Sequence, residues 1–290
     1  MASIIDLVGN TPMAELQYLN PNKNVIIYAK LEGNNPGGSV KDRAALNMIR
    51  SAIERGDITP NSKLIEATSG NTGIALAMIA SMYKLPIELV MPSNSTKERT
   101  FTMEAFGAKV TLLENIETCR DYAEEQAAKN GHFLVNQFAN KDNYLAHYKT
   151  TGPELWRDTD GKITHFVSSM GTTGTIMGTS MFLKEQNPHI QLVGCQPTEN
   201  SSIPGIRRWP IEYLPKIFDA SRVDRTIDVS QEDATIMARR LAKEEGIFSG
   251  MSSGGAAWAA IKLAQELESG IIVFICCDRG DRYLSSNLFR

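Results

Sequence analysis

Segments that read as β-strands and segments that read as α-helices alternate along nearly the whole chain of 290 residues. The strand-like segments are almost continuously apolar, as in GIIVFICC at 270–277. A strand without polar alternation is buried on both faces, and such strands occur in parallel sheets that helices cover on each side. The pattern therefore predicts an α/β fold with mostly parallel sheets flanked by helices. Further strands are expected at 25–32, 63–67, 86–92, 109–114, 163–170 and 192–197, and helices at 39–55, 74–84, 95–106, 117–130, 175–186, 231–245 and 254–268.

Charge and hydropathy exclude several functional classes. The formal net charge is only -3, so a basic face for nucleic acid is not expected. The longest apolar run, at 270–277, is far shorter than the roughly 20 residues of a membrane-spanning helix. The N-terminal residues MASIIDLVGNTP place no basic residues ahead of an apolar stretch, so no secretory signal is expected. We therefore expect a cytoplasmic protein that acts on small molecules.

The cysteines and histidines do not form a pattern that predicts a disulfide framework or a metal site. No CxxC spacing occurs, and no histidine has a partner at HxxxH or HxxE spacing. We expect no bound metal. The residues concerned are Cys119, Cys195, Cys276, Cys277, His132, His147, His165 and His189.

The pentapeptide Ser39-Val40-Lys41-Asp42-Arg43 opens the first long helix. Ser39 and Asp42 have the spacing of a capping box. A lysine in the first helical turn is disfavoured by the helix dipole by roughly 0.3–1 kcal/mol, and the same field lowers the pKa of its amine. A lysine that reacts with a carbonyl group must be neutral, so Lys41 suits that chemistry. An ordinary solvated lysine remains the simpler interpretation of these five residues alone.

Three further turns are rich in Gly, Ser and Thr and lie between a strand and a helix, where α/β sheets bind ligands. TSGNTG at 68–73 offers hydroxyl and N–H groups to a carboxylate, although a well-capped turn explains it equally. GTTGT at 171–175 could hold phosphate, and it lacks the GK[ST] of a P-loop. GMSSGG at 250–255 contains Ser252, which could face a heterocycle nitrogen or simply cap the helix. Together with Lys41, these turns describe a site for an amino acid bound to a phosphorylated carbonyl cofactor.

In their order and context, these motifs resemble those of the fold-type-II pyridoxal-phosphate enzymes, and specifically the cysteine synthases. The resemblance runs from GNTPM at 9–13 to DRGDRYLSS at 278–286. SIPGIRRWPIEYLP at 202–215 and Thr173 resemble the B isozyme of that family, O-acetylserine sulfhydrylase B. The fold implied has two subdomains, each with a mostly parallel sheet, as in the β-subunit of tryptophan synthase.

The resemblance implies roles for individual residues. Lys41 would carry pyridoxal 5'-phosphate and act as the catalytic base. The cofactor would also be bound by Asn71 at its 3′-oxygen, by Gly171, Thr172, Thr173, Gly174 and Thr175 at its phosphate, and by Ser252 at its pyridine nitrogen. The substrates would be bound by Thr68, Ser69, Gly70, Thr72, Gln137, Arg207 or Arg208, and Cys277.

The resemblance also implies the reaction and the organisation of the chain. The acetoxy group of O-acetyl-L-serine would be replaced by sulfide to give L-cysteine and acetate, and thiosulfate would give S-sulfocysteine. Residues 1–34 and 146–290 would form a larger cofactor-binding subdomain, and 35–145 a smaller mobile subdomain that closes over the substrate. A homodimer is expected, without a stable complex with serine acetyltransferase.

Other interpretations use the same residues. A serine or threonine dehydratase shares the cofactor-bearing lysine, but usually has an aromatic residue where Val40 stands and a glycine-richer loop than 171–175. Cystathionine β-synthase would need regulatory domains for which 290 residues leave no room. A catalytically silent module of the same fold would have no use for Lys41, Asn71 and Ser252 together. A nicotinamide oxidoreductase would need a GxGxxG turn, which the sequence lacks.

Overall fold

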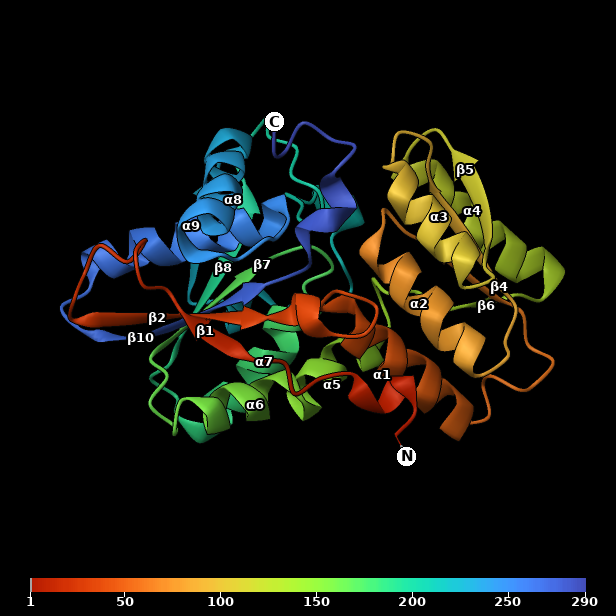
Figure 1. Cartoon of the computed structure of the whole chain (residues 1–290). Helices are drawn as coiled ribbons and strands as arrows, with labels where there is room; N and C mark the ends of the chain where they lie inside the picture. Colours follow the sequence, from red (N-terminus) through yellow and green to blue (C-terminus); the bar gives the residue numbers. More distant parts are fainter. Residues whose placement is uncertain (1) are drawn as a thin grey trace.

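Figure 1 shows a computed structural model of the chain, which describes residues 2–290. The strands are β1 (Met13–Glu15), β2 (Val25–Leu31), β3 (Leu64–Ala67), β4 (Ile87–Pro92), β5 (Lys109–Leu113), β6 (Phe133–Leu134), β7 (His165–Ser169), β8 (Gln191–Pro197), β9 (Arg225–Val229) and β10 (Gly270–Cys276). The α-helices are α1 (Lys41–Glu54), α2 (Asn71–Met82), α3 (Lys97–Ala105), α4 (Ile116–Asn130), α5 (Lys141–Lys149), α6 (Thr151–Asp158), α7 (Gly174–Gln186), α8 (Gln231–Glu245) and α9 (Met251–Glu266). Short 3₁₀ helices are η1 (Ile4–Leu7), η2 (Glu32–Asn34), η3 (Ile211–Tyr213), η4 (Ala220–Arg222) and η5 (Gly280–Tyr283).

The strands described form two sheets. The first has the order β1-β2-β10-β7-β8-β9, and the second β5-β4-β3-β6. The strand pairs are parallel except for β1 with β2, where a three-residue strand lies antiparallel at the sheet edge. The predicted α/β class with mostly parallel sheets is confirmed.

Helices cover both faces of each sheet (Figure 1). In the large lobe, defined as the first sheet with α5 to α9, helices α8 and α9 lie on one face and α7 with α6 on the other. In the small lobe, defined as the second sheet with α2 to α4, helix α4 covers one face and α2 with α3 the other. Helix α1 packs against both α2 and α5, so it joins the two lobes.

The apolar run at the end of the chain forms the centre of the large sheet. Strand β10 lies parallel to β2 and β7, and its residues Ile272, Val273, Phe274 and Ile275 are at most 1% exposed. Helix α9, which covers β10, also packs closely on α8. A Cβ on Gly254 of α9 would overlap the backbone of α8. A buried parallel strand has no solvent face, which explains its unbroken hydrophobicity.

Two helices begin earlier than predicted, within the turns proposed to bind ligands. Helix α2 begins at Asn71 and α9 at Met251, so Ser252 lies in a first helical turn and does not cap it. The elements β1, β6, β9, α5 and α6 were not predicted. The strands among them are short or largely exposed, and the 141–158 segment is rich in polar residues, so neither gives a strong hydrophobic period.

The capping box predicted from Ser39 and Asp42 is wrong. The Ser39 hydroxyl accepts a weak hydrogen bond from the N–H of Lys41 at 3.3 Å. The Asp42 carboxylate instead accepts from the N–H of Gly37, a residue that precedes the helix. The start of α1 is fixed by the chain before it, and Val40 N–H also donates to the carbonyl of Cys277 at 2.8 Å.

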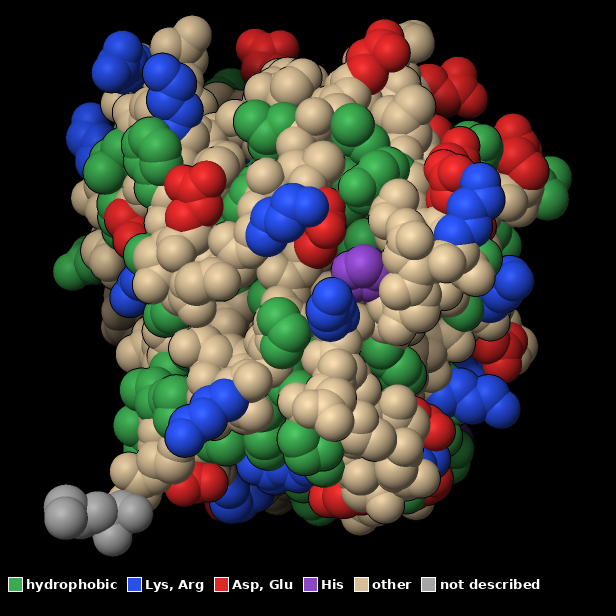
Figure 2. All heavy atoms as spheres, turned by 90° about the vertical axis from the view of Figure 1, so that its right-hand side faces the viewer, with side chains coloured by type: hydrophobic (Ala, Val, Ile, Leu, Met, Phe, Trp, Pro, Cys, Tyr) green, Lys and Arg blue, Asp and Glu red, His purple; other side chains and the backbone are tan. Residues whose placement is uncertain are grey.

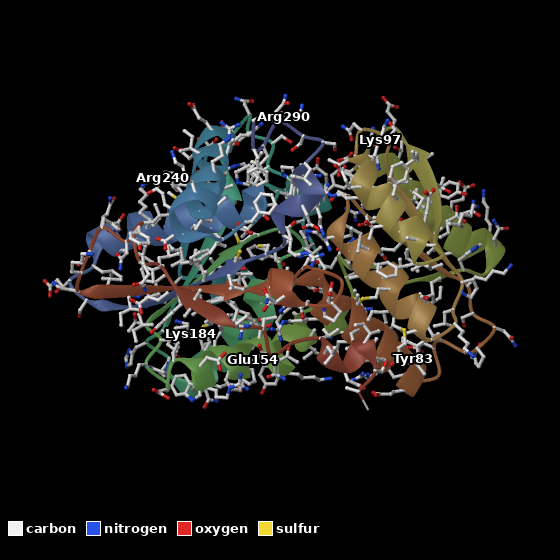
Figure 3. All side chains as sticks on the ribbon, in the orientation of Figure 1. Tyr83, Lys97, Glu154, Lys184, Arg240 and Arg290 are labelled. Atoms are coloured by element: carbon white, nitrogen blue, oxygen red, sulfur yellow. The ribbon has the colours of Figure 1, made fainter. Side chains whose placement is uncertain are left out.

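A buried network of charges fixes α1 to the large lobe. Arg43 is 2% exposed; its guanidinium pairs with Glu32 at 2.7 Å and with Glu154 at 2.6 Å. Glu154, labelled in Figure 3, also pairs with buried Lys30 at 2.9 Å. Its Oε1 accepts from the N–H of Asn10 at 2.9 Å. The N-terminal segment, β2, α1 and α6 therefore meet at one guanidinium.

Charged side chains lie mixed over the surface. Figure 2 shows Lys and Arg interspersed with Asp and Glu on the outer face of the small lobe. Within residues 2–290, no helix is both long and apolar enough to cross a membrane.

Replacing Arg43 by Met should lower the free energy of unfolding by about 3–5 kcal/mol, because two buried carboxylates lose their counter-charge. We expect a large shift of the urea midpoint at pH 7. The matched control is Arg225→Met, which breaks an ion pair with Glu266 whose side chains are both 43% exposed, and should cost under about 1 kcal/mol. Equal shifts for the two variants would contradict a dominant role for the buried network.

The effect of Arg43→Met should also depend on pH. Ion pairing outweighs burial and lowers the pKa of Glu154 to about 2, from an ordinary value of 4.5. A carboxylate with a lowered folded-state pKa stabilises the protein above its unfolded pKa, and this contribution is lost as pH falls through the folded value. The difference between wild type and Arg43→Met should therefore shrink as pH falls below about 4.5.

Candidate active site

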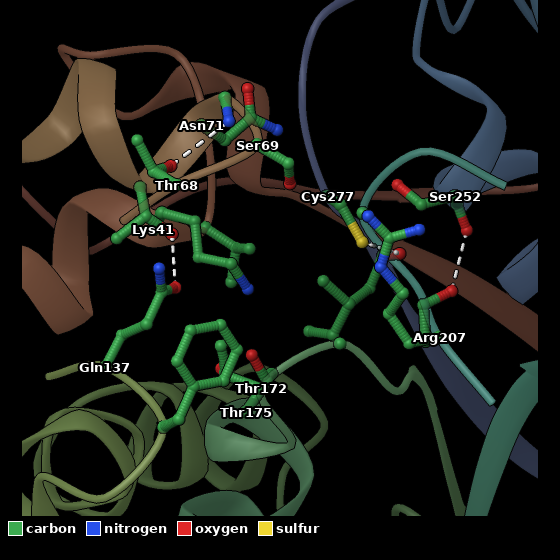
Figure 4. Close-up of a pocket in the computed structure, with 18 of the residues that line it drawn as sticks. Lys41, Thr68, Ser69, Asn71, Gln137, Thr172, Thr175, Arg207, Ser252 and Cys277 are labelled. Carbon is green, nitrogen blue, oxygen red and sulfur yellow. Dashed lines mark hydrogen bonds between the residues drawn. The ribbon is translucent and has the colours of Figure 1, made fainter. Parts of the chain in front are cut away.

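One cavity lies between the lobes and collects most of the predicted site residues (Figure 4). It forms where β3, β7 and β10 end, which is the edge at which parallel sheets bind ligands. The predicted residues that line it are Lys41, Thr68, Ser69, Gly70, Asn71, Thr72, Gln137, Gly171, Thr172, Thr175, Arg207, Ser252 and Cys277.

Lys41 is the first residue of α1 and extends into this cavity. Desolvation in the cavity lowers the pKa of its amine, although the charge of nearby Asp278 acts in the opposite direction. Burial thus has the larger effect here, where the sequence suggested the helix dipole. A neutral amine is the form that reacts with a carbonyl carbon or accepts a proton.

The 68–72 turn is held in shape by its own side chains. The Thr68 hydroxyl accepts from the N–H groups of Gly70 and Gly73, both at 3.1 Å. Thr72 donates to Gln137 Oε1 at 2.8 Å, and Gln137 Nε2 donates to the carbonyl of Ala67 at 2.9 Å. The turn lines the cavity and leads into the N-terminus of α2, a position that favours carboxylate binding.

The 171–175 turn leads into α7 in an unusual backbone conformation. Thr173 has φ 70°, and its buried hydroxyl oxygen has no hydrogen-bond partner within the described structure. A Cβ on Gly174 would overlap the side-chain amide of Asn143, whose Nδ2 donates to Thr172 at 3.2 Å. The structure places Thr172 and Thr175 on the cavity wall and puts Thr173 and Gly174 behind them.

The residues present fit pyridoxal phosphate. The N-terminus of the 13-residue helix α7 lies at the cavity wall that Thr172 and Thr175 form, and the free N–H groups of its first turn suit a phosphate group. Lys41 supplies an amine whose lowered pKa favours reaction with the aldehyde. Ser252, 4% exposed, also lines the cavity and offers a neutral hydroxyl to a ring nitrogen.

Two residues carry additional polar groups into the cavity. Asn71 donates through Nδ2 to Asp278 at 2.7 Å and accepts at Oδ1 from Arg282. Cys277 follows β10, and burial raises the pKa of its thiol to about 12, so it is neutral. A neutral thiol gives the wall polarizable surface without charge.

The structure separates the two candidate arginines. Arg207 lines the cavity (Figure 4). Arg208 does not: its guanidinium pairs with Asp228 at 2.7 Å and donates to the carbonyl of Pro197 at 3.0 Å. Of the two, Arg207 alone is placed to meet an anion in the cavity.

Several residues at this site were not predicted. His147 is 1% exposed and lies behind the 171–175 turn, with Nε2 at 3.4 Å from the Thr175 hydroxyl. Burial, with the charges of Arg43 and Lys41, holds its pKa well below the usual value, so the ring is neutral. Asn143, Arg99 and Tyr283 were also missed. A search for motifs near glycine-rich turns cannot find residues that reach the site from other elements.

Comparisons with known proteins agree with the motifs. The family model described as pyridoxal-phosphate dependent enzyme matches residues 4–278. "Cysteine synthase B" of Pseudomonas aeruginosa is 58% identical over 290 residues, covering 99% of this chain and 97% of the relative. "Cysteine synthase B" of Escherichia coli is 54% identical over 292 residues, covering 100% and 96%.

Solved structures show the same fold. The cysteine synthase of Entamoeba histolytica has a TM-score of 0.94 at 36% identity, covering 100% of this chain and 90% of the other. An O-ureido-L-serine synthase also has a TM-score of 0.94, at 34% identity, covering 100% and 95%. The resemblance to the cysteine synthases and the expected cofactor are confirmed. The chain belongs to the family of pyridoxal-phosphate-dependent enzymes.

Proposed function

We propose that the chain is a cysteine synthase, which replaces the acetoxy group of O-acetyl-L-serine by sulfide to give L-cysteine and acetate. The observation that carries this proposal is the cavity itself. It combines Lys41, whose pKa is lowered by desolvation, with turns at 68–72 and 171–175 that suit a carboxylate and a phosphate. The relatives named cysteine synthase B support this choice over a dehydratase or a silent module.

Bound pyridoxal phosphate would supply the electron sink that lets an amino acid lose its Cα proton and a β-substituent. Residues of the chain would bind and orient the substrate and transfer the proton. The 68–72 turn binds the substrate carboxylate and so orients Cα toward Lys41. The Lys41 amine accepts the Cα proton; desolvation lowers its pKa and so favours the neutral form that a general base needs. Acetate leaves from Cβ, hydrosulfide adds to the same carbon, and Lys41 returns the proton to Cα.

The test is product formation by the purified holoenzyme. With O-acetyl-L-serine and sulfide, mass spectrometry should detect cysteine and acetate in equal amounts. Lys41→Ala should lower the turnover number by at least about 10²-fold, since it removes the general base. Pyruvate and ammonia as main products would support a dehydratase, and an unaltered rate in Lys41→Ala would contradict the role of Lys41.

Use of thiosulfate as a second sulfur donor is part of the proposal, and Arg207 supports it. A guanidinium on the cavity wall can make charge-assisted hydrogen bonds to the oxygens of a larger anion. Sulfide has no such oxygens. Arg207 would therefore favour thiosulfate without being needed for sulfide.

Arg207→Ala should lower kcat/KM for thiosulfate by about 10- to 100-fold, the loss of one charge-assisted hydrogen bond, with little change for sulfide. Arg208→Ala is the matched control, because the neighbouring guanidinium is paired with Asp228 outside the cavity. The two donors should be compared for each variant. An equal loss for both donors in Arg207→Ala, or the same donor preference in both variants, would show that Arg207 does not select the donor.

We also propose that residues 35–145 close over the bound acceptor toward residues 1–34 and 146–290. The cavity supports this, because its lining comes from both lobes, with Thr68 to Thr72 on one side and Ser252 and Cys277 on the other (Figure 4). Closure would exclude water from the reacting Cβ. Hydrogen exchange across 35–145 that O-acetylserine leaves unchanged would contradict this closure.

The remaining proposals rest on the resemblance to the B isozyme. We propose a homodimer that acts without a stable complex with serine acetyltransferase. A cytoplasmic location agrees with four unpaired cysteines, three of them buried. Size-exclusion chromatography with light scattering tests the dimer when the protein is run alone, and tests for a stable complex when it is run with serine acetyltransferase.

A further inference from the structure

Arg99 lies in the first turn of α3, in the small lobe, and reaches the cavity from outside the motifs. It is 8% exposed. Its Nη1 donates to the carbonyl of Ser69 at 3.0 Å, so it contacts the backbone of the 68–72 turn directly. Its buried Nε has no hydrogen-bond partner within the described structure.

The neighbouring Gly70 has no side chain and so leaves room for Arg99. Gly70 has φ 155°, and a Cβ there would lie 2.7 Å from both Cδ and Nε of Arg99. Any other residue at position 70 would therefore displace the guanidinium or the turn. The close approach ties the conformation of the turn to the position of the arginine.

On its other side, Arg99 contacts the large lobe. Its guanidinium carbon lies 5.1 Å from the centre of the Tyr283 ring in η5, within the range of a cation–π contact. The Tyr283 hydroxyl donates to Asp278 Oδ2 at 2.7 Å, the same oxygen that accepts from Asn71. One side chain thus touches the turn proposed to bind the acceptor and the segment that follows β10.

The same two elements also meet at the surface. Ser285 donates to Glu98 through its N–H at 2.8 Å and through its hydroxyl at 2.6 Å. The Thr96 hydroxyl donates to the carbonyl of Arg282 at 3.3 Å. Helix α3 and residues 278–285 therefore meet at three points. Asn71 joins the 68–72 turn directly to Asp278 and Arg282, and Arg99 adds a second connection that runs from the turn through α3.

We propose that Arg99 is a positioning residue that holds the 68–72 turn for the acceptor carboxylate and links occupancy of that turn to seating of residues 278–285. Its planar guanidinium makes both contacts at once, one by hydrogen bonding and one by stacking. Lysine keeps the charge but cannot reproduce this geometry. Arg99 can act in this way only if the turn binds the acceptor, so this role rests on the proposed function.

The first measurement is the reaction of O-acetyl-L-serine with the holoenzyme in the absence of a sulfur donor, followed by the visible spectrum. Arg99→Lys should raise the half-saturating concentration of O-acetylserine about tenfold. The limiting rate, and the later reaction with sulfide, should stay within about twofold. Lys262→Met is the matched control: it removes a cation that lies 5.0 Å from the Trp258 ring on α9, away from the cavity, and should change none of these values.

The second measurement is hydrogen exchange with saturating O-acetylserine. In the wild type, protection should rise in both 68–72 and 278–285. In Arg99→Lys, the rise in 278–285 should be smaller than in the wild type, because only the Asn71 contacts still join the two segments. Tyr283→Leu leaves the bond to Ser69 in place but removes the ring, and should reduce the protection of 278–285 in the same way.

The outcomes separate this role from the proposed function. A wild type that does not respond to O-acetylserine would overturn both. A wild type that responds, together with Arg99→Lys and Tyr283→Leu variants that protect both segments normally, would overturn the role of Arg99 alone. If Arg99→Lys binds no cofactor, Tyr283→Leu decides the question by itself: undiminished protection of 278–285 overturns the link, and reduced protection supports it.

Discussion

The buried guanidinium of Arg43 is the contact on which the geometry of the site depends. It neutralises Glu32 at the end of β2 and Glu154 on α6, and both carboxylates are at most 5% exposed. Burying three charges is tolerable only when each has partners in good geometry, so these elements have little freedom to move relative to one another. Lys41 lies two residues before Arg43 on α1, and its position is therefore set by the same ion pairs.

The cavity that results is chemically asymmetric. At one end desolvation lowers the pKa of Lys41, and at the other lies the N-terminus of α7, which suits an anion. Neutral groups, Ser252 and Cys277, also line the cavity. A cofactor with an aldehyde at one end and a phosphate at the other matches this arrangement of charge. The same arrangement leaves Arg207 and Arg99 as cations near where anionic substrates would bind.

Much of the fold could be predicted because it depends on local patterns. The unbroken apolar run of β10 required burial on both faces, and the structure confirms it. Helices α5 and α6 were missed because their sequences are polar and show no strong hydrophobic period. In the structure they pack against α1 and α7. The start of α1 was explained wrongly, since Asp42 bonds to Gly37 and not to the predicted partner. A hydrogen bond from a helix residue to a residue outside the helix cannot be predicted from the spacing of residues within the helix.

The site divides in the same way. Glycine-rich turns at the ends of strands were identified from sequence, because close contacts at Gly70, Gly171 and Gly174 leave no room for a side chain. Asn143, Arg99 and Tyr283 reach the site from distant elements, and their sequence contexts carry no such mark. The choice between Arg207 and Arg208 also needed the structure, because only the ion pair with Asp228 distinguishes them.

Lys41 is proposed to carry the cofactor, and reductive trapping of the lysine–cofactor bond tests this attachment. The holoenzyme would be reduced with borohydride, digested, and its peptides sequenced by mass spectrometry. We expect the peptide that contains Lys41 to carry the added mass of pyridoxyl phosphate. We expect no peptide with this added mass from Lys41→Ala. Attachment to a different lysine in the wild type, or no covalent attachment in a protein that binds the cofactor and is active, would contradict it.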